Sequence, residues 1–502
     1  MRFSFVMACA SLLITAFLRC SALAQTPAAA GADLPSARLL FRQGDFRGAA
    51  AAFHKMIERE PAPESWGGLI QSLLKLDDVK SAEESSRQAL EAFPQSALTH
   101  AARGDVEFRR GLMKEAADQY QTALKIDPAC ARAWLGQGKL DSVMARRSRA
   151  KQSVAKAHEL DSQDGDALYE WAIRQPYPAN VKGLEAHLDE FHSDAETEGH
   201  ERDYLELLKA LAGREVWILR PDVAHTELKL EPMNAGPGLG TRGYGLHVVF
   251  NGRAWATLLV DTGASGVTIT RKFAEKIGAR KLSDQTLHGL GKESAVHGYQ
   301  AWVDKVVIGD LEFHDCFVHV APQTVVDADG LIGTDIFEKF LVTLDFSTRK
   351  LRLDPLSPRA ALADDPPDEA QSLSPAISFG HLLLVEAQAS GKTSGLFALD
   401  SGSNVSTISS DLGKGMSQMR PWNTAVRGVS GGANSSYVAD NVTLEFAKTR
   451  RSSQRLITVD LHSVSKDLGT EVSGQIGFST LEGLRVVIDY RDGRVGFAEK
   501  SK

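Results

Sequence analysis

Two kinds of hydrophobic spacing divide the chain. From about Leu39 to Ile173, apolar residues recur at helical spacing among alanine, leucine and charged residues, which predicts amphipathic helices. After about residue 240 the apolar residues instead form short runs of strand length, and two of these runs end on an acid, a hydroxyl residue and a glycine. The pattern predicts a multidomain α + β protein, in which an α-helical region is followed by mainly β units.

The helical part repeats with a period of about 34 residues. Pro61, Pro94 and Pro128 lie 33 and 34 positions apart. Small residues follow the same period at Ala49, Ala82, Ala116 and Ala150. About four such units are visible, and because one helix pair cannot bury its apolar face alone, neighbouring pairs are expected to stack. We place this domain at residues 35–212 and expect capping helices from 176 to 212.

This period, with a proline at the end of a unit and small residues at the helix crossing, resembles the tetratricopeptide repeat family. The resemblance implies a curved superhelix whose concave face binds a peptide or a partner protein. A purely structural spacer is the alternative, because no pattern of ligand-reading residues is evident. We therefore keep two expectations for the repeats, a docking surface for a protein partner and a spacer.

The β part contains one segment twice, at Leu258–Ser265 and Leu396–Ser403. Each copy ends an apolar run with an acid, a hydroxyl residue and a glycine, in the triplets Asp261-Thr262-Gly263 and Asp400-Ser401-Gly402. A second glycine motif follows each copy, and Gly333 and Gly477 lie 72 and 77 positions after their aspartates. These matched intervals indicate an internal duplication of one β-rich unit.

An aspartate at the end of a buried strand is costly unless it is hydrogen-bonded and has a task. Asp261 and Asp400 occupy equivalent positions in the two copies, which indicates a site built from paired acids. Two carboxyls a few ångströms apart do not both ionise readily, so the pair holds one proton and supplies an acid and a base together. Acid–base chemistry by such a pair requires neither a metal nor a covalent intermediate, and we predict no cofactor and no metal.

The glycines beside the aspartates have a predicted role in the backbone. Gly263 and Gly402 allow a tight turn that brings amide donors towards the carboxylates. The residue after each glycine differs, with Ala264 in one copy and Ser403 in the other. If Ser403 donates to the carboxylate of its own copy, that carboxylate is stabilised and the proton resides more often on the other aspartate.

These motifs resemble the aspartic protease family in its retropepsin-like form, over roughly residues 240–498. The resemblance implies two mainly β lobes, each an acid-protease barrel. We place the first lobe at residues 225–355 and the second at 370–498, with a proline- and aspartate-rich link from Pro355 to Glu369 between them.

The resemblance also implies roles for individual residues. Asp261 and Asp400 become the catalytic pair, and Thr262 and Ser401 hydrogen-bond across the lobe junction. The family places a flap hairpin over its cleft, and each copy here has a glycine-containing loop at the corresponding position. The candidate flap glycines are Gly289, Gly291, Gly431 and Gly432. These loops are compatible with three arrangements, namely one working flap, two working flaps, or an ordinary β-turn at each site.

The first residues predict export. Met1-Arg2 precedes an apolar stretch from Phe3 to Leu18, and Ala22-Leu23-Ala24 offers a small-residue cleavage site. This is the pattern of a secretory signal peptide at residues 1–24, and a retained N-terminal anchor is the alternative. We therefore expect a periplasmic or secreted protein with no membrane span after signal removal.

Charge and cysteine content argue against a nucleic-acid partner and against a disulfide-stabilised fold. The net charge of −7 carries mixed signs, so nothing recommends a nucleic-acid partner. Of the four cysteines only Cys130 and Cys316 lie outside the signal segment, so no disulfide framework is indicated.

Neither of two histidine clusters is a convincing metal site. His187 and His192 are expected on a solvated helical surface, because they are five positions apart among acids. In a strand-like run, alternation is expected to place His314 and Cys316 on one face and His319 on the other.

The whole sequence predicts an exported aspartic endopeptidase that hydrolyses a peptide or protein substrate with a water activated by Asp261 and Asp400. The runner-up is a catalytically silent peptide-binding or assembly protein in which the repeats dominate. A third hypothesis is that each lobe pairs with a lobe of another chain, instead of the two lobes forming a monomeric pseudo-dimer.

Overall fold

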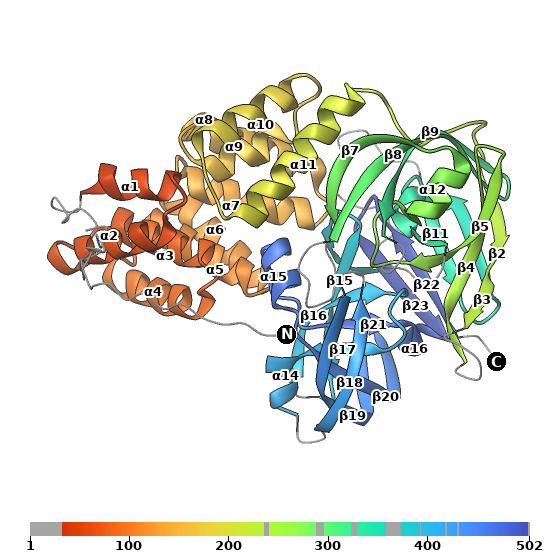
Figure 1. Ribbon diagram of the computed structural model, residues 1–502. Coiled ribbons are helices and arrows are strands. Elements are labelled where there is room, and N and C mark those ends of the chain that lie inside the picture. The colour runs from red at the N-terminus through yellow and green to blue at the C-terminus, as the bar shows by residue number, and fades with distance from the viewer. Residues whose placement is uncertain are drawn as a thin grey trace, which may run out of the picture.

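The computed structural model describes residues 33–234, 240–287, 296–322, 329–357, 373–391, 393–416, 419–428 and 431–499. The expected signal peptide, most of the link between the lobes, and the candidate flap residues Gly289 and Gly291 lie outside the described residues. A helical half and a β half lie side by side (Figure 1). Among the described helices, none combines the length and the apolar character needed to cross a membrane.

Helices fill the first part of the described chain. Their bounds are α1 Leu34–Arg42, α2 Phe46–Arg59, α3 Pro63–Lys75, α4 Val79–Ala92, α5 Ala97–Arg109, α6 Met113–Ile126, α7 Ala131–Val143, α8 Arg147–Leu160, α9 Gly165–Ala172, α10 Ala179–Glu190 and α11 Ala195–Leu211. Asp45 and Asp78 cap α2 and α4, since each carboxylate accepts a main-chain amide of the first turn. Consecutive helices pack against each other in a curved array (Figure 1).

Small residues are what allow these helices to approach closely. The four periodic alanines are at most 2 % exposed, namely Ala49, Ala82, Ala116 and Ala150. Glycines serve the same purpose, because a Cβ on Gly68 would lie 2.3 Å from the ring of Phe53. The period seen in the sequence therefore marks the contacts between helices.

Lobe 1 is a nine-stranded sheet that closes on itself. Its strands are β1 Ile218–Leu219, β3 Glu231–Asn234, β4 Thr241–Phe250, β5 Ala254–Asp261, β6 Val267–Thr270, β7 Arg280–Leu287, β8 Val296–Ile308, β9 Leu311–Ala321 and β10 Gly330–Gly333, and helix α12 spans Arg271–Ile277. The strand order is β1-β9-β6-β10-β5-β4-β8-β7, and β3 pairs with β4. An additional pairing of β9 with β8 closes the strands into a barrel around an apolar core.

Lobe 2 repeats this plan in an eight-stranded sheet. Its strands are β14 Ile377–Phe379, β15 Leu382–Ala389, β16 Thr393–Asp400, β17 Ser406–Ser409, β18 Arg420–Gly428, β19 Gly431–Phe446, β20 Thr449–Val459 and β21 Gly474–Gly477. The strand order is β14-β15-β16-β21-β17-β20-β19-β18, and β15 also pairs with β19. Three short helices accompany them, α14 Ser410–Lys414, α15 His462–Leu468 and α16 Phe478–Leu481.

One strand arrangement occurs in both lobes and positions the aspartates. In lobe 1, β10 lies between β5, to which it is parallel, and β6, to which it is antiparallel. In lobe 2, β21 lies in the same way between β16 and β17. The register pairs Gly333 with Asp261 and Gly477 with Asp400. The glycine motifs that match by spacing in the sequence therefore lie beside the two aspartates.

A third sheet joins the lobes. Its strands are β2 Thr226–Lys229, β11 Phe340–Asp345, β12 Lys350–Pro355, β13 Ser374–Pro375, β22 Leu484–Asp489 and β23 Arg494–Glu499, in the order β13-β23-β22-β11-β12-β2. The equivalent strands β11 and β22 pair antiparallel at its centre, with Thr343 opposite Val487. The apolar side chains that flank this pair are buried, so the sheet fixes one lobe against the other.

The helical half contacts both lobes. At lobe 2, the hydroxyl of Thr470 and the amide of Glu471 each donate to a carbonyl at the end of α5, both at 2.8 Å. At lobe 1, the carboxylate of Asp203 in α11 accepts from the amide of Thr286 in β7 at 2.7 Å. Specific hydrogen bonds therefore attach the repeats to each lobe.

His192 is exposed as expected, but the expectations for His187 and for the faces of β9 are wrong. His187 is 8 % exposed and stacks on Phe191, because α10 packs this face against α9 and α11 instead of solvent. His314 is half-buried and Cys316 is fully buried, so they lie on different faces of β9. The cause is Asp315, whose φ of +53° changes the phase of the inward and outward alternation.

Candidate active site

Asp261 is the last residue of β5, and Asp400 is the last residue of β16. At the lobe junction the two carboxyls are close enough to hydrogen-bond to each other. A Cβ on Gly402 would lie 2.3 Å from Cγ of Asp261, and a Cβ on Gly263 would lie 2.9 Å from Cγ of Asp400. Glycine is needed at both positions because a side chain there would displace the carboxyl of the opposite lobe.

Thr262 and Ser401 form a symmetric set of hydrogen bonds across the junction. The Thr262 amide donates to Ser401 Oγ at 3.1 Å, and the Ser401 amide donates to Thr262 Oγ1 at 2.9 Å. Each hydroxyl donates in turn to a carbonyl of the opposite lobe, Leu399 for Thr262 and Val260 for Ser401, both at 2.9 Å. Four buried hydrogen bonds thus join the two loops and hold the aspartates together.

The two carboxyls receive different hydrogen bonds. Oδ1 of Asp261 accepts from the amide of Gly263 at 2.8 Å. Oδ1 of Asp400 accepts from the amide of Ser403 at 2.9 Å, and Oδ2 of Asp400 accepts from Nε2 of Gln475 at 2.7 Å. The two carboxyls therefore differ both in the position of the main-chain donor and in the presence of a side-chain donor.

Only the main chain of Ser403 reaches its aspartate. The hydroxyl turns away and donates to the carbonyl of Val405 at 2.9 Å, which corrects the expectation that this side chain supports the carboxylate. Gln475 takes that place, and it has no counterpart among the sequence predictions. The available signal was a polar residue where the matching glycine motif of lobe 1 has Leu331.

Burial and the interaction between the two carboxyls shift their pKa values by different amounts. Burial raises the pKa of Asp261 well above its usual value, and the charge of Asp400 raises it further. Burial also raises the pKa of Asp400, while hydrogen bonds from the Ser403 amide and from Asp261 lower it. The proton that the pair shares is therefore held mainly by Asp261, and Asp400 is the carboxyl that ionises first.

Comparisons with known proteins agree with this geometry. A family model described as aspartyl protease matches residues 246–336, and a tetratricopeptide repeat model matches residues 34–97, 69–129 and 101–140. The chain carries an aspartyl protease domain and tetratricopeptide repeats. Both resemblances predicted from the sequence are thereby confirmed. The protease match covers much of lobe 1, and lobe 2 is related to lobe 1 by its strand arrangement.

The chain was also compared with solved structures and with curated proteins. A solved structure of a thermophilic TPR protein from Thermus thermophilus is 18 % identical, with a TM-score of 0.28, over 34 % of this chain and 94 % of that chain. No curated protein matches the chain.

Strand pairs lead to the predicted flap positions of both lobes. β7 and β8 pair antiparallel in lobe 1, and Gly289 and Gly291 lie between them, outside the described residues. β18 and β19 pair antiparallel in lobe 2, where Gly428 is opposite Gly431 and β19 continues with Gly432. The described strands therefore form a hairpin stem in each lobe.

His381 of lobe 2 approaches the aspartate loop of lobe 1. Its Nε2 lies 3.3 Å from the carbonyl of Gly263. Burial lowers the pKa of His381, and burial together with the charge of His381 lowers the pKa of His319 to about 4. Both rings are therefore neutral near pH 7, and Nε2–H of His381 donates to the carbonyl. No pattern in the sequence singled out His381.

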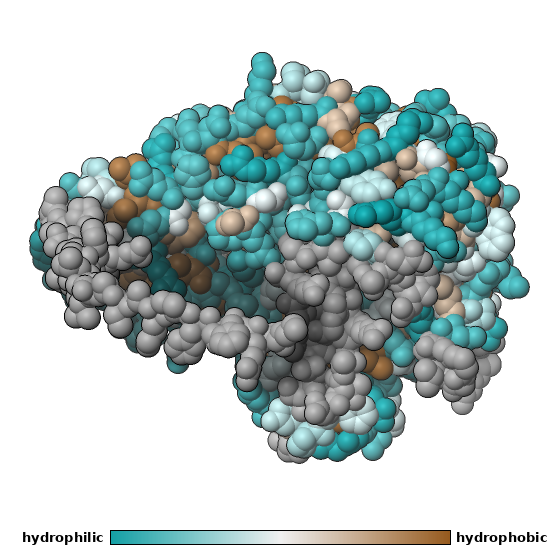
Figure 2. Space-filling model, in the orientation of Figure 1, coloured by the Kyte–Doolittle hydropathy of each residue, from teal (hydrophilic) through white to brown (hydrophobic). Residues whose placement is uncertain are grey.

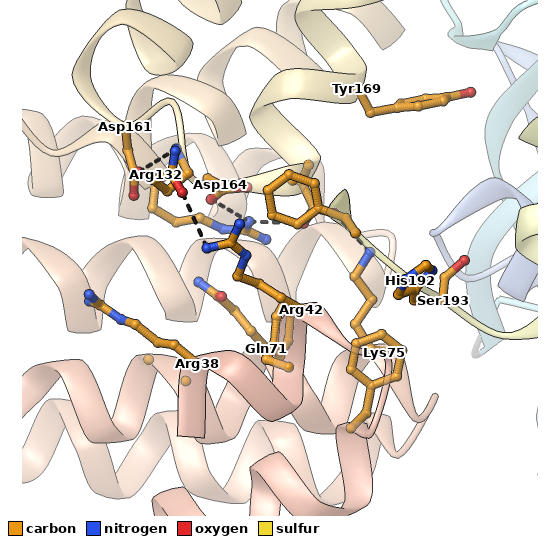
Figure 3. A pocket seen from close by; sticks show the side chains of 18 of the residues that line it. Arg38, Arg42, Gln71, Lys75, Arg132, Asp161, Asp164, Tyr169, His192 and Ser193 are labelled. Carbon is orange, nitrogen blue, oxygen red and sulfur yellow. Dashed lines mark hydrogen bonds and ion pairs between the residues drawn. The ribbon is translucent and has the colours of Figure 1, made fainter. Parts of the chain in front are cut away.

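A second candidate site lies in the tetratricopeptide repeats. A cavity of about 960 Å³ occupies their concave side, and residues Lys466–Gly469 of lobe 2 contribute to its wall. Apolar side chains line part of this hollow (Figure 2). Arg42, Gln71 and Lys75 project from one wall, and Arg132 projects from the other (Figure 3).

The charges in this cavity are largely paired. Asp166 lies 2.8 Å from Nζ of Lys75 and 3.0 Å from Nη1 of Arg132, so it bridges the two walls. Within the described ranges, no group of three or more histidine, cysteine, aspartate or glutamate side chains is arranged to hold a metal ion. The cavity therefore combines apolar surface with charges of both signs.

Proposed function

We propose that the protein is an aspartic endopeptidase in which Asp261 and Asp400 activate one water molecule against a peptide bond. The set of buried hydrogen bonds at Thr262 and Ser401 carries the proposal, because it keeps the two carboxyls in contact. A purely structural role accounts poorly for two buried acids in contact, since each raises the cost of ionising the other.

In the proposed reaction, Asp400 is the base and Asp261 is the acid. Asp400 takes a proton from the water while the water oxygen bonds to the carbonyl carbon, and Asp261 gives its proton to the carbonyl oxygen. The tetrahedral intermediate then collapses. Asp400 passes its proton to the amide nitrogen, the C–N bond breaks, and Asp261 regains a proton from a hydroxyl of the intermediate. The pair ends with one proton, as it began.

Amino-acid replacement tests the pair directly. Wild-type protein is expected to cleave members of a peptide library at mildly acidic to near-neutral pH, and Asp261→Asn and Asp400→Asn should each lower kcat by about 10²- to 10⁴-fold. Asp411→Asn is the matched control, because the side chain of Asp411 in lobe 2 is 91 % exposed. A wild-type protein that binds library peptides and leaves them intact would support the silent peptide-binding alternative instead.

We also propose that the protein acts outside the cytoplasm and that the repeats dock its protein substrate. The apolar stretch from Phe3 to Leu18 followed by small residues supports export. The cavity in the repeats supports docking, since it offers apolar surface and paired charges to an extended peptide segment. Cell fractionation with N-terminal sequencing of the mature protein tests export, and a protein that keeps residues 1–24 in the cytoplasm would contradict it.

A further inference from the structure

One position distinguishes the two strands that lie beside the aspartates. β10 reads Gly330-Leu331-Ile332-Gly333, and β21 reads Gly474-Gln475-Ile476-Gly477. β10 lies between β5 and β6, β21 lies between the equivalent strands β16 and β17, and both end beside an aspartate. Leu331 is 6 % exposed and apolar, whereas Gln475 brings an amide group to the equivalent place. A side-chain amide costs free energy in such a strand unless its hydrogen bonds are made.

Both ends of the Gln475 side chain are hydrogen-bonded. Nε2 donates to Oδ2 of Asp400 at 2.7 Å, and Oε1 accepts from the hydroxyl of Thr407 at 3.0 Å. Thr407 lies in β17 and is 1 % exposed, so its hydroxyl is held in place. An ionised carboxylate only accepts hydrogen bonds, so the NH₂ end of the amide faces Asp400, and the Thr407 hydroxyl donates to the carbonyl end. Among the described residues, no side-chain amide donates to Asp261 in this way.

We propose that Gln475 is a positioning residue that assigns the role of base to Asp400. An N–H donor binds a carboxylate more strongly than a neutral carboxyl, so the contact favours negative charge on Asp400 and leaves the shared proton on Asp261. The inference rests on the proposed function, because it concerns the reaction of the same pair. Gln475 thereby converts a duplicated, nearly symmetric site into one with a fixed acid and a fixed base.

The contact also bears on the second half of the reaction. After Asp400 has taken a proton from water, the amide of Gln475 still lies against Oδ2 and still favours the ionised form. Protonated Asp400 is therefore a stronger acid than it would be without this donor. That favours transfer of the proton to the leaving nitrogen, so Gln475 affects kcat more than KM.

Gln475→Leu tests the proposal, because it gives lobe 2 the residue that lobe 1 has. Loss of the donor makes the Asp400 carboxylate harder to form, so the pair should lose its first proton at higher pH. We expect the acid limb of the kcat/KM profile to move up by about one pH unit, since a hydrogen bond to a charged group has roughly that strength. Maximal kcat should fall several-fold while KM changes little. A residue with only a structural role would lower thermal stability without moving the acid limb.

Thr407 supplies a second test that does not alter Gln475. Thr407→Val removes the hydroxyl that orients the amide and should move the acid limb in the same direction by a smaller amount, whereas Thr407→Ser keeps the hydroxyl and should retain the wild-type profile. The matched control is Thr268→Val, because Thr268 lies opposite Leu331 in lobe 1 and has no amide to orient. An equal shift for Thr268→Val would overturn the proposal.

A readout that does not depend on cleavage separates this inference from the proposed function. In protein labelled with ¹³C at the aspartate carboxyl carbon, NMR titration follows the pair directly, and Asp400→Asn assigns its signals. A shifted first titration step in Gln475→Leu supports the positioning contact, even if the wild-type protein cleaves nothing and the proposed function fails. An unshifted titration in a variant of an active protease overturns the inference and leaves the proposed function intact.

Discussion

Lobe 1 and lobe 2 position their aspartates with the same strand arrangement, yet they surround them with different groups. Asp261 has a main-chain donor at Gly263, and its lobe has the apolar Leu331 at the place where lobe 2 has Gln475. Asp400 has donors on both carboxylate oxygens. The comparison teaches that matching strands bring the two carboxyls together, whereas the hydrogen-bond donors around each carboxyl differ between the lobes.

The largest expected effects come from removing one carboxyl of the pair. Besides losing activity, Asp261→Asn should be more stable than the wild type at neutral pH. Burial and the charge of Asp400 raise the pKa of Asp261, so the unfolded chain ionises at lower pH than the folded chain. Wild-type stability therefore falls as the pH rises above about 4, the ordinary value for aspartate. Asparagine cannot ionise and avoids this loss.

Urea unfolding at pH 3 and at pH 7 measures this effect. The gain in unfolding free energy for Asp261→Asn should be present at pH 7. It should be nearly absent at pH 3, because Asp261 is then protonated in both the folded and the unfolded wild-type chain. A gain of equal size at both pH values would show that ionisation is not its cause. Asp411→Asn, at an exposed position, should give no gain at either pH.

The cross-lobe hydrogen bonds should behave symmetrically, in contrast to the carboxyls. Thr262→Val leaves the Leu399 carbonyl without its donor and the Ser401 amide without its acceptor, so it should cost about 2–4 kcal/mol of unfolding free energy. Ser401→Ala removes the corresponding pair of bonds and should cost a similar amount. Thr262→Ser keeps the hydroxyl and serves as the control. Denaturant unfolding compares them, and a cost confined to one lobe would refute the symmetry.

The position of the aspartates was predictable from the sequence because its signals are local. An apolar run, an acid, a hydroxyl residue and a glycine occur together, and the glycine motifs that pair with them recur at similar distances. The helical repeat was predictable for the same reason, since buried alanines return once per helix pair. Each of these signals depends on residues within one element or one repeat.

The groups that make the two lobes different were not predictable in this way. Gln475 reaches Asp400 across 75 positions, and only the placement of β21 between β16 and β17 brings them together. His187 was expected in solvent because its own helix carries acids, but the packing of α9 and α11 on α10 buries it. Contacts of this kind depend on which elements pack together, and the local pattern does not record that.

The attachment of the repeats should also differ between the lobes. Thr470 is fully buried, and its hydroxyl donates to a carbonyl of α5, so Thr470→Val should cost about 1–3 kcal/mol. Asp203→Ala removes a partly buried contact to lobe 1 and should cost about 0.5–1.5 kcal/mol. Thr470→Ser is the control that retains the hydroxyl. Thermal unfolding of the three variants compares these costs. A larger loss of stability for Asp203→Ala than for Thr470→Val would contradict the prediction.

The smallest expected effect is at Ser403, the residue that differs from Ala264 after the two glycines. Ser403→Ala gives lobe 2 the residue of lobe 1, but the hydroxyl it removes donates to Val405 and not to Asp400. The amide that does donate to Asp400 is part of the main chain and is kept in this variant. The acid limb of the kcat/KM profile should therefore stay within about 0.2 pH units of wild type, and only the small free energy of one local hydrogen bond should be lost. A shift as large as that of Gln475→Leu would mean that the asymmetry of the pair arises at the loop after the glycine and not at the strand beside it.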